Sequence, residues 1–242
     1  MRGVLVAQAN KLGDSMKRRS KKTSSSNISQ KITPLTAKTD NQVDYITSII
    51  ENDVIFCTGP SGSGKSFISA GIASQHLYHN EIDKVVITRP LVCAGKDIGS
   101  LPGELLDKIA PYLMPMQEHF RFFLGQAYYG HFFNDSKITY QPLEVMRGST
   151  FDNSYMILDE AQNCTFDQIK MFITRMGKNS KVLINGDVDQ TDIRNRSGLS
   201  IIINKLKNIK GVGVVTLDYN DIQRNGILGR ILAALENDND QL

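Results

Sequence analysis

Short apolar runs recur along the chain from Pro34 onward, and polar, glycine or proline residues close them. Because the runs are continuous rather than alternating with polar residues, we expect strands that are buried on both faces. Strands of this kind form a mainly parallel sheet that helices cover. The predicted strands are Asp53–Thr58, Lys84–Thr88, Tyr155–Leu158, Lys181–Asn185 and Val212–Leu217.

Helical patterns lie between the apolar runs. Phe67–Ala73 follows the first predicted strand with helical character, and Phe166–Ile173 has helical apolar spacing with Thr165 as its N-cap. The alternation of strands and helices predicts an α/β fold with helices on both faces of the sheet. A further apolar stripe suits packing against either a core or a partner. It consists of Ile227, Leu228, Ile231, Leu232 and Leu235.

Residues 96–150 do not follow this alternation. They contain Leu101–Glu104, an aromatic-rich segment over Tyr112–Phe133 and a strand-like run at Lys137–Tyr140. We interpret this stretch as an insertion, or an elaborated crossover, that lies on the C-terminal edge of the sheet.

Composition places the chain among ordinary globular proteins. It has 242 residues, of which 40% are apolar and 22% charged. No apolar run approaches the ~20 residues that a membrane-spanning helix requires. Met1–Asn10 also lacks a signal-peptide pattern, so we expect a cytoplasmic protein without a membrane partner. The cysteines Cys57, Cys93 and Cys164 are too scattered for a zinc site and are interpreted as reduced thiols.

Positive charge is concentrated at the start of the chain, although the formal net charge is only +3. Residues 1–33 are basic, serine-rich and poor in apolar side chains, which predicts a flexible arm ahead of one domain over 34–242. The arm suits either a nucleic-acid contact or a solvated tail. Basic residues in the first forty positions include Lys11, Lys17, Arg18, Arg19, Lys21, Lys22, Lys31 and Lys38.

A complete phosphate-binding motif follows the first predicted strand and opens a helix, the context that such a motif requires. The motif is Gly59, Pro60, Ser61, Gly62, Ser63, Gly64, Lys65 and Ser66. Its glycines permit a backbone that turns N–H groups toward phosphates, and the helix adds its N-terminal donors. We expect Lys65 to contact the β- and γ-phosphates of ATP and Ser66 to bind Mg²⁺, and we assign Phe67 to the nucleotide site as well. A glycine-rich loop without a nucleotide is the alternative.

Two adjacent carboxylates follow the strand that ends at Leu158. Asp159 is a candidate ligand in the magnesium shell, on a strand expected to neighbour the one before the loop. Glu160 is a candidate base that polarises the attacking water, which favours hydrolysis over transfer of the phosphoryl group to a small molecule. A helix cap with a first-turn acid is the alternative for such a pair.

Gln190 follows the strand over Lys181–Asn185, where an amide can sense the γ-phosphate from a neighbouring strand. An ordinary loop residue explains a glutamine there equally well.

The order of these segments resembles that of the PhoH-like ATPases, a group with a single RecA-like domain that is related to superfamily 1 helicases. The resemblance runs from about Pro34 to the C-terminus and is therefore specific, which the phosphate-binding motif alone would not be. The matching positions are Gln42, Gly59–Ser66, Thr88–Pro90, Gly95, Leu101–Leu105, Pro111–Leu113, Leu158–Asn163, Gln168–Arg175, Gly186–Gln190, Ser197–Leu199 and Asp221–Arg224.

The resemblance implies further roles for single residues. Gln42 corresponds to a glutamine that reads adenine, and Asp187 with Gln190 to a γ-phosphate sensor. Arg224 corresponds to an arginine that stabilises transition-state charge, in the same chain or across a subunit boundary. Asn225 stands where relatives usually have histidine. Two arginines are candidates for nucleic-acid phosphates, with surface or ion-paired arginines as the alternative; they are Arg89 and Arg175.

The chain has one predicted RecA-like domain, so it lacks the two-domain cleft of a superfamily 1 helicase. The resemblance implies a homo-oligomer, with a hexameric ring favoured, that binds ATP and single-stranded RNA or DNA.

Three functions are therefore compared. The first is an oligomeric Mg²⁺-dependent ATPase coupled to nucleic acid, with RNA helicase or translocase activity as its extension. The second is a nucleotide-gated module that binds RNA or protein with little turnover. The third, a small-molecule kinase, would need an acceptor pocket and usually a mobile lid, and the adjacent Asp159 and Glu160 resemble a hydrolase arrangement more closely.

Overall fold

The computed structural model describes residues 32–90, 105–190, 197–223 and 231, all of which belong to one unit over Ile32–Leu242. Residues 1–31 of the predicted arm lie outside this part of the chain. So do Gly95, Leu101–Glu104, and the stripe over 227–235 except for Ile231. Among the described helices, none is long and apolar enough to cross a lipid bilayer.

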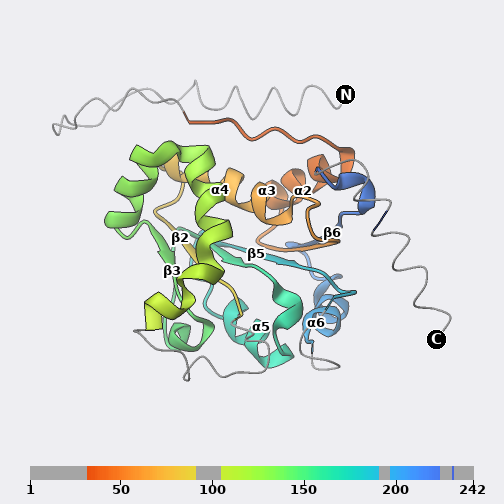
Figure 1. Ribbon diagram of the computed structural model, residues 1–242. Coiled ribbons are helices and arrows are strands. Elements are labelled where there is room, and N and C mark those ends of the chain that lie inside the picture. Colours follow the sequence, from red (N-terminus) through yellow and green to blue (C-terminus); the bar gives the residue numbers. More distant parts are fainter. Residues whose placement is uncertain (1–31, 91–104, 191–196, 224–230, 232–242) are drawn as a thin grey trace. The chain divides into compact units, whose positions relative to one another are not determined.

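The sheet has six strands in the order β3-β2-β4-β5-β1-β6, and every pairing between neighbours is parallel (Figure 1). The parallel sheet predicted from the continuous apolar runs is therefore confirmed. The strands are β1 (Val54–Thr58), β2 (Lys84–Thr88), β3 (Ile138–Tyr140), β4 (Ser154–Leu158), β5 (Lys181–Gly186) and β6 (Val212–Thr216).

One predicted adjacency is wrong. The strand that ends before Asp159 is β4, and β5 lies between it and β1. Each residue of β1 from Val54 to Thr58 pairs with β5 on one side and with β6 on the other, so no pairing position on β1 is left for β4. Local apolar runs identify strands, but they do not specify which strands pair.

Helices cover both faces of the sheet, as expected (Figure 1). Alternate side chains of the central strands enter separate cores: in β1, Ile55 and Cys57 pack on one face, and Val54 and Phe56 on the other. The first core receives α2 (Asp40–Glu51), α3 (Lys65–Tyr78) and α4 (Leu105–Asn134), and the second receives α5 (Phe166–Ile173) and α6 (Leu199–Leu206). Burial of both faces explains why the central positions of these strands are continuously apolar.

The long helix α4 leads from β2 to β3, which pairs with β2 as the edge strand. It is two helices joined at Gly125, whose φ of 72° and ψ of 161° are not helical. The first of them contributes Met116 and Phe120 to the same core as α3. This packing places part of α4 beside the start of α3, where the phosphate-binding motif lies.

Candidate nucleotide site

The phosphate-binding motif forms the turn between β1 and α3. Gly59 has a φ of +141°, and a Cβ at this position would lie 2.2 Å from the carbonyl oxygen of Leu217. Only glycine therefore fits where the loop leaves the strand. Gly64, with a φ of 103° and a ψ of 5°, is the N-cap of α3, so the motif ends where the helix offers its unpaired N–H groups.

The ammonium of Lys65 lies over its own loop. Its Nζ donates to the carbonyl oxygens of Gly59, at 2.5 Å, and Pro60, at 2.9 Å. The buried Ser63 hydroxyl also donates to Pro60 O, at 2.8 Å, and closes the loop on itself. A phosphate between the loop N–H groups would offer Lys65 a charged acceptor in place of two carbonyl groups, and charge-assisted hydrogen bonds are the stronger kind.

Ser66 and Asp159 meet at the floor of the site. The Ser66 hydroxyl donates to Asp159 Oδ1 at 2.6 Å, and the backbone N–H of Asp159 donates to Thr88 O at 3.0 Å. Burial raises the pKa of Asp159, as does the neighbouring Glu160 carboxylate, while the Ser66 hydrogen bond lowers it. A carboxylate and a hydroxyl are the hard oxygen donors that Mg²⁺ binds, usually one or two from the protein with phosphates and waters completing the shell. Ser66 and Asp159 therefore fit this ion.

Glu160 lies next to this pair in a strained backbone conformation. Its φ of 56° and ψ of 43° are in the left-handed region, which non-glycine residues adopt at a cost of about 1–3 kcal/mol. Both carboxylate oxygens have partners: Oε1 accepts from Arg89 Nη2 at 3.0 Å, and Oε2 accepts from Gln162 Nε2 at 2.7 Å. The surrounding contacts therefore determine where this carboxylate points.

Gln162 connects Glu160 to the end of β5. While its Nε2 donates to Glu160, its Oε1 accepts from the backbone N–H of Asp187 at 3.0 Å. The close approach depends on Gly186, where a Cβ would lie 3.1 Å from Gln162 Oε1 and 2.6 Å from Leu199 Cδ2. Burial raises the pKa of Asp187. A side chain that follows β4 is thus hydrogen bonded directly to the backbone that follows β5.

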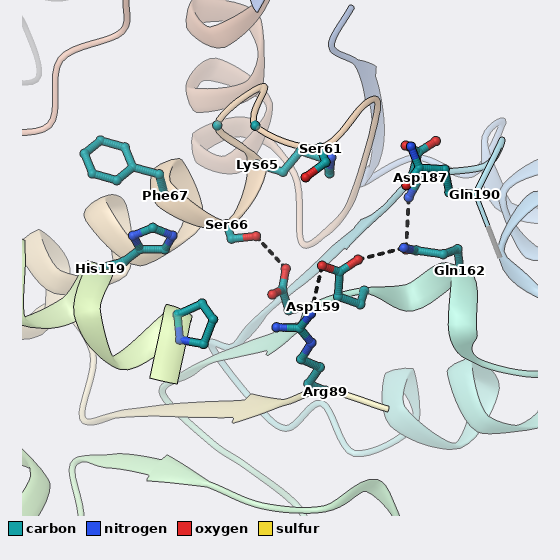
Figure 2. A pocket seen from close by; sticks show the side chains of 14 residues that line it. Ser61, Lys65, Ser66, Phe67, Arg89, His119, Asp159, Gln162, Asp187 and Gln190 are labelled. Carbon is teal, nitrogen blue, oxygen red and sulfur yellow. Dashed lines mark hydrogen bonds and ion pairs between the residues drawn. The ribbon is translucent and has the colours of Figure 1, made fainter. Parts of the chain in front are cut away.

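These residues surround a pocket of about 430 Å³ (Figure 2). It is lined by Ser61, Gly62, Gly64, Lys65, Ser66, Phe67, Arg89, Pro115, His119, Asp159, Glu160, Gln162, Asp187 and Gln190. The structure therefore brings the loop, the two carboxylates, Asp187 and Gln190 to one place.

Three lining residues had no role assigned from the sequence. Pro115 and His119 belong to α4, and the His119 ring lies 5.5 Å from the Phe67 ring. Burial lowers the pKa of His119, which favours the neutral imidazole. No sequence motif marks these two residues, because they reach the pocket only through the packing of α4 against α3. Gln162 stands two residues after Glu160, and that polar position beside the acidic pair is the signal that could have found it.

Gln42 does not line the pocket. Its side chain is buried, its Oε1 accepts from Lys38 N at 2.9 Å, and its Nε2 donates to Ser63 O at 2.9 Å. In this arrangement the Gln42 amide joins α2 to the phosphate-binding loop through a hydrogen bond. The adenine-reading role that the resemblance implies for Gln42 stays a prediction.

The two candidate nucleic-acid arginines lie at opposite ends of the parallel strands. Arg89 follows β2 and lines the pocket. Arg175 lies beside the start of β4: its carbonyl accepts from Phe151 N at 3.0 Å, and its Nη1 donates to Ser149 O at 3.3 Å. Because all strands of a parallel sheet point the same way, Arg89 lies at their C-terminal ends and Arg175 at their N-terminal ends. One phosphate therefore cannot bridge both residues.

Arg224 lies outside the described residues, but the segment before it is visible beside the loop. Gln223 N donates to Gly62 O at 3.4 Å. The buried Asp221 carboxylate accepts from the Thr39 hydroxyl, from Asn41 Nδ2 at 2.9 Å and from Asp218 N at 2.7 Å. Asp221 thereby joins the short helix η4 (Tyr219–Asp221) to the start of α2.

An all-parallel sheet in this order, with the phosphate-binding loop leaving β1, makes the chain a RecA-like P-loop NTPase. A family model described as "PhoH-like protein" matches residues 34–236, and the chain belongs to this family.

Relatives agree with this assignment. The chain is 42% identical over 202 residues to a PhoH-like protein of Synechocystis sp., covering 83% of this chain and 62% of the relative. It is 39% identical over 204 residues to a PhoH-like protein of Bacillus subtilis, covering 84% and 64%. The chain thus spans about three fifths of the length of these curated relatives. Among solved structures, a large terminase from a thermophilic bacteriophage is similar at a TM-score of 0.47 and 13% identity, covering 80% of this chain and 49% of that one.

Proposed function

We propose that this protein hydrolyses ATP in the presence of Mg²⁺. The observation that carries the proposal is the position of Glu160, beside the Ser66–Asp159 pair and on the same pocket as Lys65. Loop N–H groups and Lys65 would bind the phosphates, and Ser66 with Asp159 would hold Mg²⁺. The bound ion would neutralise phosphate charge. Glu160 would accept a hydrogen bond from the attacking water, and Gln190 with Asp187 would sense the γ-phosphate.

We also propose that turnover is coupled to single-stranded RNA or DNA. Arg89 presents a guanidinium at the pocket, and the basic residues within 1–33 offer further contacts to phosphates. A helicase or translocase activity is the extension of this proposal. It would require a second copy of the chain to complete the cleft, in a homo-oligomer for which a hexameric ring is favoured.

In such an assembly Arg224 would stabilise transition-state charge. The contact of Gln223 with Gly62 supports action on the nucleotide of the same chain, whereas a ring would allow action on a neighbour. Mixing Arg224→Ala with Lys65→Ala subunits distinguishes the two. Recovered turnover means action across the boundary, and no recovery at any ratio means action within one chain.

A second candidate function is a nucleotide-gated module that binds RNA or protein with little turnover. One observation favours it: each oxygen of the Glu160 carboxylate already accepts a hydrogen bond, so Arg89 and Gln162 compete with a water for this base.

The deciding experiment is release of free phosphate from ATP, with and without Mg²⁺ and with and without single-stranded RNA, on a sample of measured mass. We expect multiple turnovers that require Mg²⁺ and rise with RNA in an oligomer. Tight ATP binding without turnover would favour the gated module, and a monomer indifferent to RNA would remove the coupling.

A further inference from the structure

The contact between Arg89 and Glu160 joins the ends of β2 and β4, which are neighbours in the sheet (Figure 2). The two side chains form an ion pair with a distance of 3.0 Å between Nη2 and Oε1. Their exposed fractions are 23% for Arg89 and 37% for Glu160, so solvent and ligands reach both. The candidate base is therefore paired with a cation that faces the same pocket.

This pairing opposes the role proposed for Glu160. A carboxylate oxygen that accepts from a guanidinium has less electron density for a water proton, and the guanidinium takes up one of the two acceptor sites of that oxygen. The other oxygen, Oε2, accepts from Gln162. Each oxygen keeps a second acceptor site, but the guanidinium withdraws electron density from Oε1, so loss of the Arg89 contact makes Glu160 a better acceptor for a water proton.

The two contacts differ in how readily they exchange. Gln162 is buried, with 6% exposure, and its second amide atom accepts from Asp187 N, so its position is determined from both sides. The Arg89 contact is partly exposed, and ion pairs of this kind are weak and sensitive to competing ions. A guanidinium also binds phosphate in a bidentate way. Arg89 is thus the contact that a phosphate group can remove.

Arg89 approaches Glu160 from the side away from the phosphate-binding loop. In the sheet, β4 and β5 lie between β2 and β1, the strand that precedes the loop. With neighbouring strands about 4.8 Å apart, the ends of β2 and β1 are separated by roughly 14 Å. A phosphate bound by the loop therefore lies nearest to Lys65, whereas Arg89, which lines the same pocket from the other side of Glu160, is the cation that a second phosphate group would meet.

We propose that the Arg89–Glu160 ion pair restrains hydrolysis and that a backbone phosphate of a single-stranded nucleic acid releases it by binding the Arg89 guanidinium. Release frees Oε1 to accept a hydrogen bond from water, while Gln162 keeps Oε2 in place. The inference rests on the proposed ATPase function and specifies how nucleic acid acts on it.

The test measures phosphate release by the full chain, with ATP and Mg²⁺, with and without a single-stranded RNA 20-mer. Removing the pair with Arg89→Ala should raise turnover without RNA by roughly two- to fivefold, the factor that a partly exposed ion pair supports. The same variant should no longer respond to RNA. Arg89→Lys keeps the charge without the planar fork, and we expect it to retain part of the response.

Arg147→Ala is the matched control, because Arg147 is exposed and does not line the pocket. It should behave like the unaltered chain in both conditions. Turnover without RNA that falls or stays the same in both Arg89 variants would overturn the restraint. A raised KM for ATP in those variants would also overturn it, because Arg89 would then bind the nucleotide.

Failure of the proposed ATPase function would give a different result from failure of the restraint. An unaltered chain that releases no phosphate in any condition would remove the ATPase itself and the restraint with it. Turnover in the unaltered chain that ignores RNA, together with a rise in Arg89→Ala, would retain the restraint and exclude nucleic acid as the releasing ligand.

Discussion

The Ser66 hydroxyl donates a 2.6 Å hydrogen bond to Asp159 Oδ1, joining residues that are 93 positions apart in the sequence. Ser66 is the second residue of α3, and Asp159 follows β4, so the contact spans the intervening end of β5. It places a hydroxyl and a carboxylate side by side at the phosphate-binding loop. The proposed binding of Mg²⁺ requires this hydroxyl and this carboxylate.

Lys65→Ala should abolish turnover and weaken nucleotide affinity roughly 100-fold, which corresponds to about 2.7 kcal/mol. The reason is the loss of a charge-assisted contact to the phosphates. Isothermal titration with a non-hydrolysable ATP analogue measures the affinity, and circular dichroism checks the fold. Unchanged affinity would mean that Lys65 stays on the carbonyl groups of Gly59 and Pro60 when nucleotide binds.

Glu160→Gln should leave ATP affinity nearly unchanged and lower kcat by about 10²–10⁴, the usual contribution of a positioned base. Glutamine keeps the size of the side chain and its Oε1 can still accept from Arg89, although its amide nitrogen can no longer accept from Gln162. Single-turnover phosphate release measures the chemical step. A variant with full activity would remove Glu160 as the base.

Gln162→Ala should lower kcat about tenfold, equivalent to about 1.4 kcal/mol of barrier, while KM changes little. Without the amide, Glu160 loses its link to the end of β5 and samples unproductive positions. Gln168→Ala is the control: Gln168 belongs to the capping box of α5 with Thr165 and does not line the pocket. We expect it to reduce stability slightly and to leave kcat alone. A rise in KM alone for Gln162→Ala would indicate a binding role instead.

Asp221→Ala should lower the free energy of unfolding by about 2–4 kcal/mol, because it leaves the donors of Thr39, Asn41 and Asp218 without their buried acceptor. Urea denaturation measures the change. Asp44→Ala, at an exposed position on the same helix α2, should change stability by no more than about 0.5 kcal/mol. Similar effects in the two variants would show that Asp221 does not join η4 to α2.

Local patterns were sufficient for the parts of this protein that depend on consecutive residues. The continuous apolar runs predicted strands within one residue of their ends, since burial on both faces requires an apolar side chain at each position. The motif from Gly59 to Ser66 predicted a loop at a helix start because its glycines and helix donors act within a few residues. The adjacent Asp159 and Glu160 were likewise readable as a pair.

Only the tertiary structure decided which of these segments meet. The strand order placed β5 between β1 and β4, against the adjacency expected from the sequence. It also brought Arg89 to Glu160 and separated Arg89 from Arg175. Gln162 and the α4 residue His119 entered the pocket through contacts between elements that are far apart in the chain. The physical reason is that periodicity encodes which side of an element is buried. Which other helix or strand packs against that buried side depends on strand pairing and side-chain packing across the whole domain.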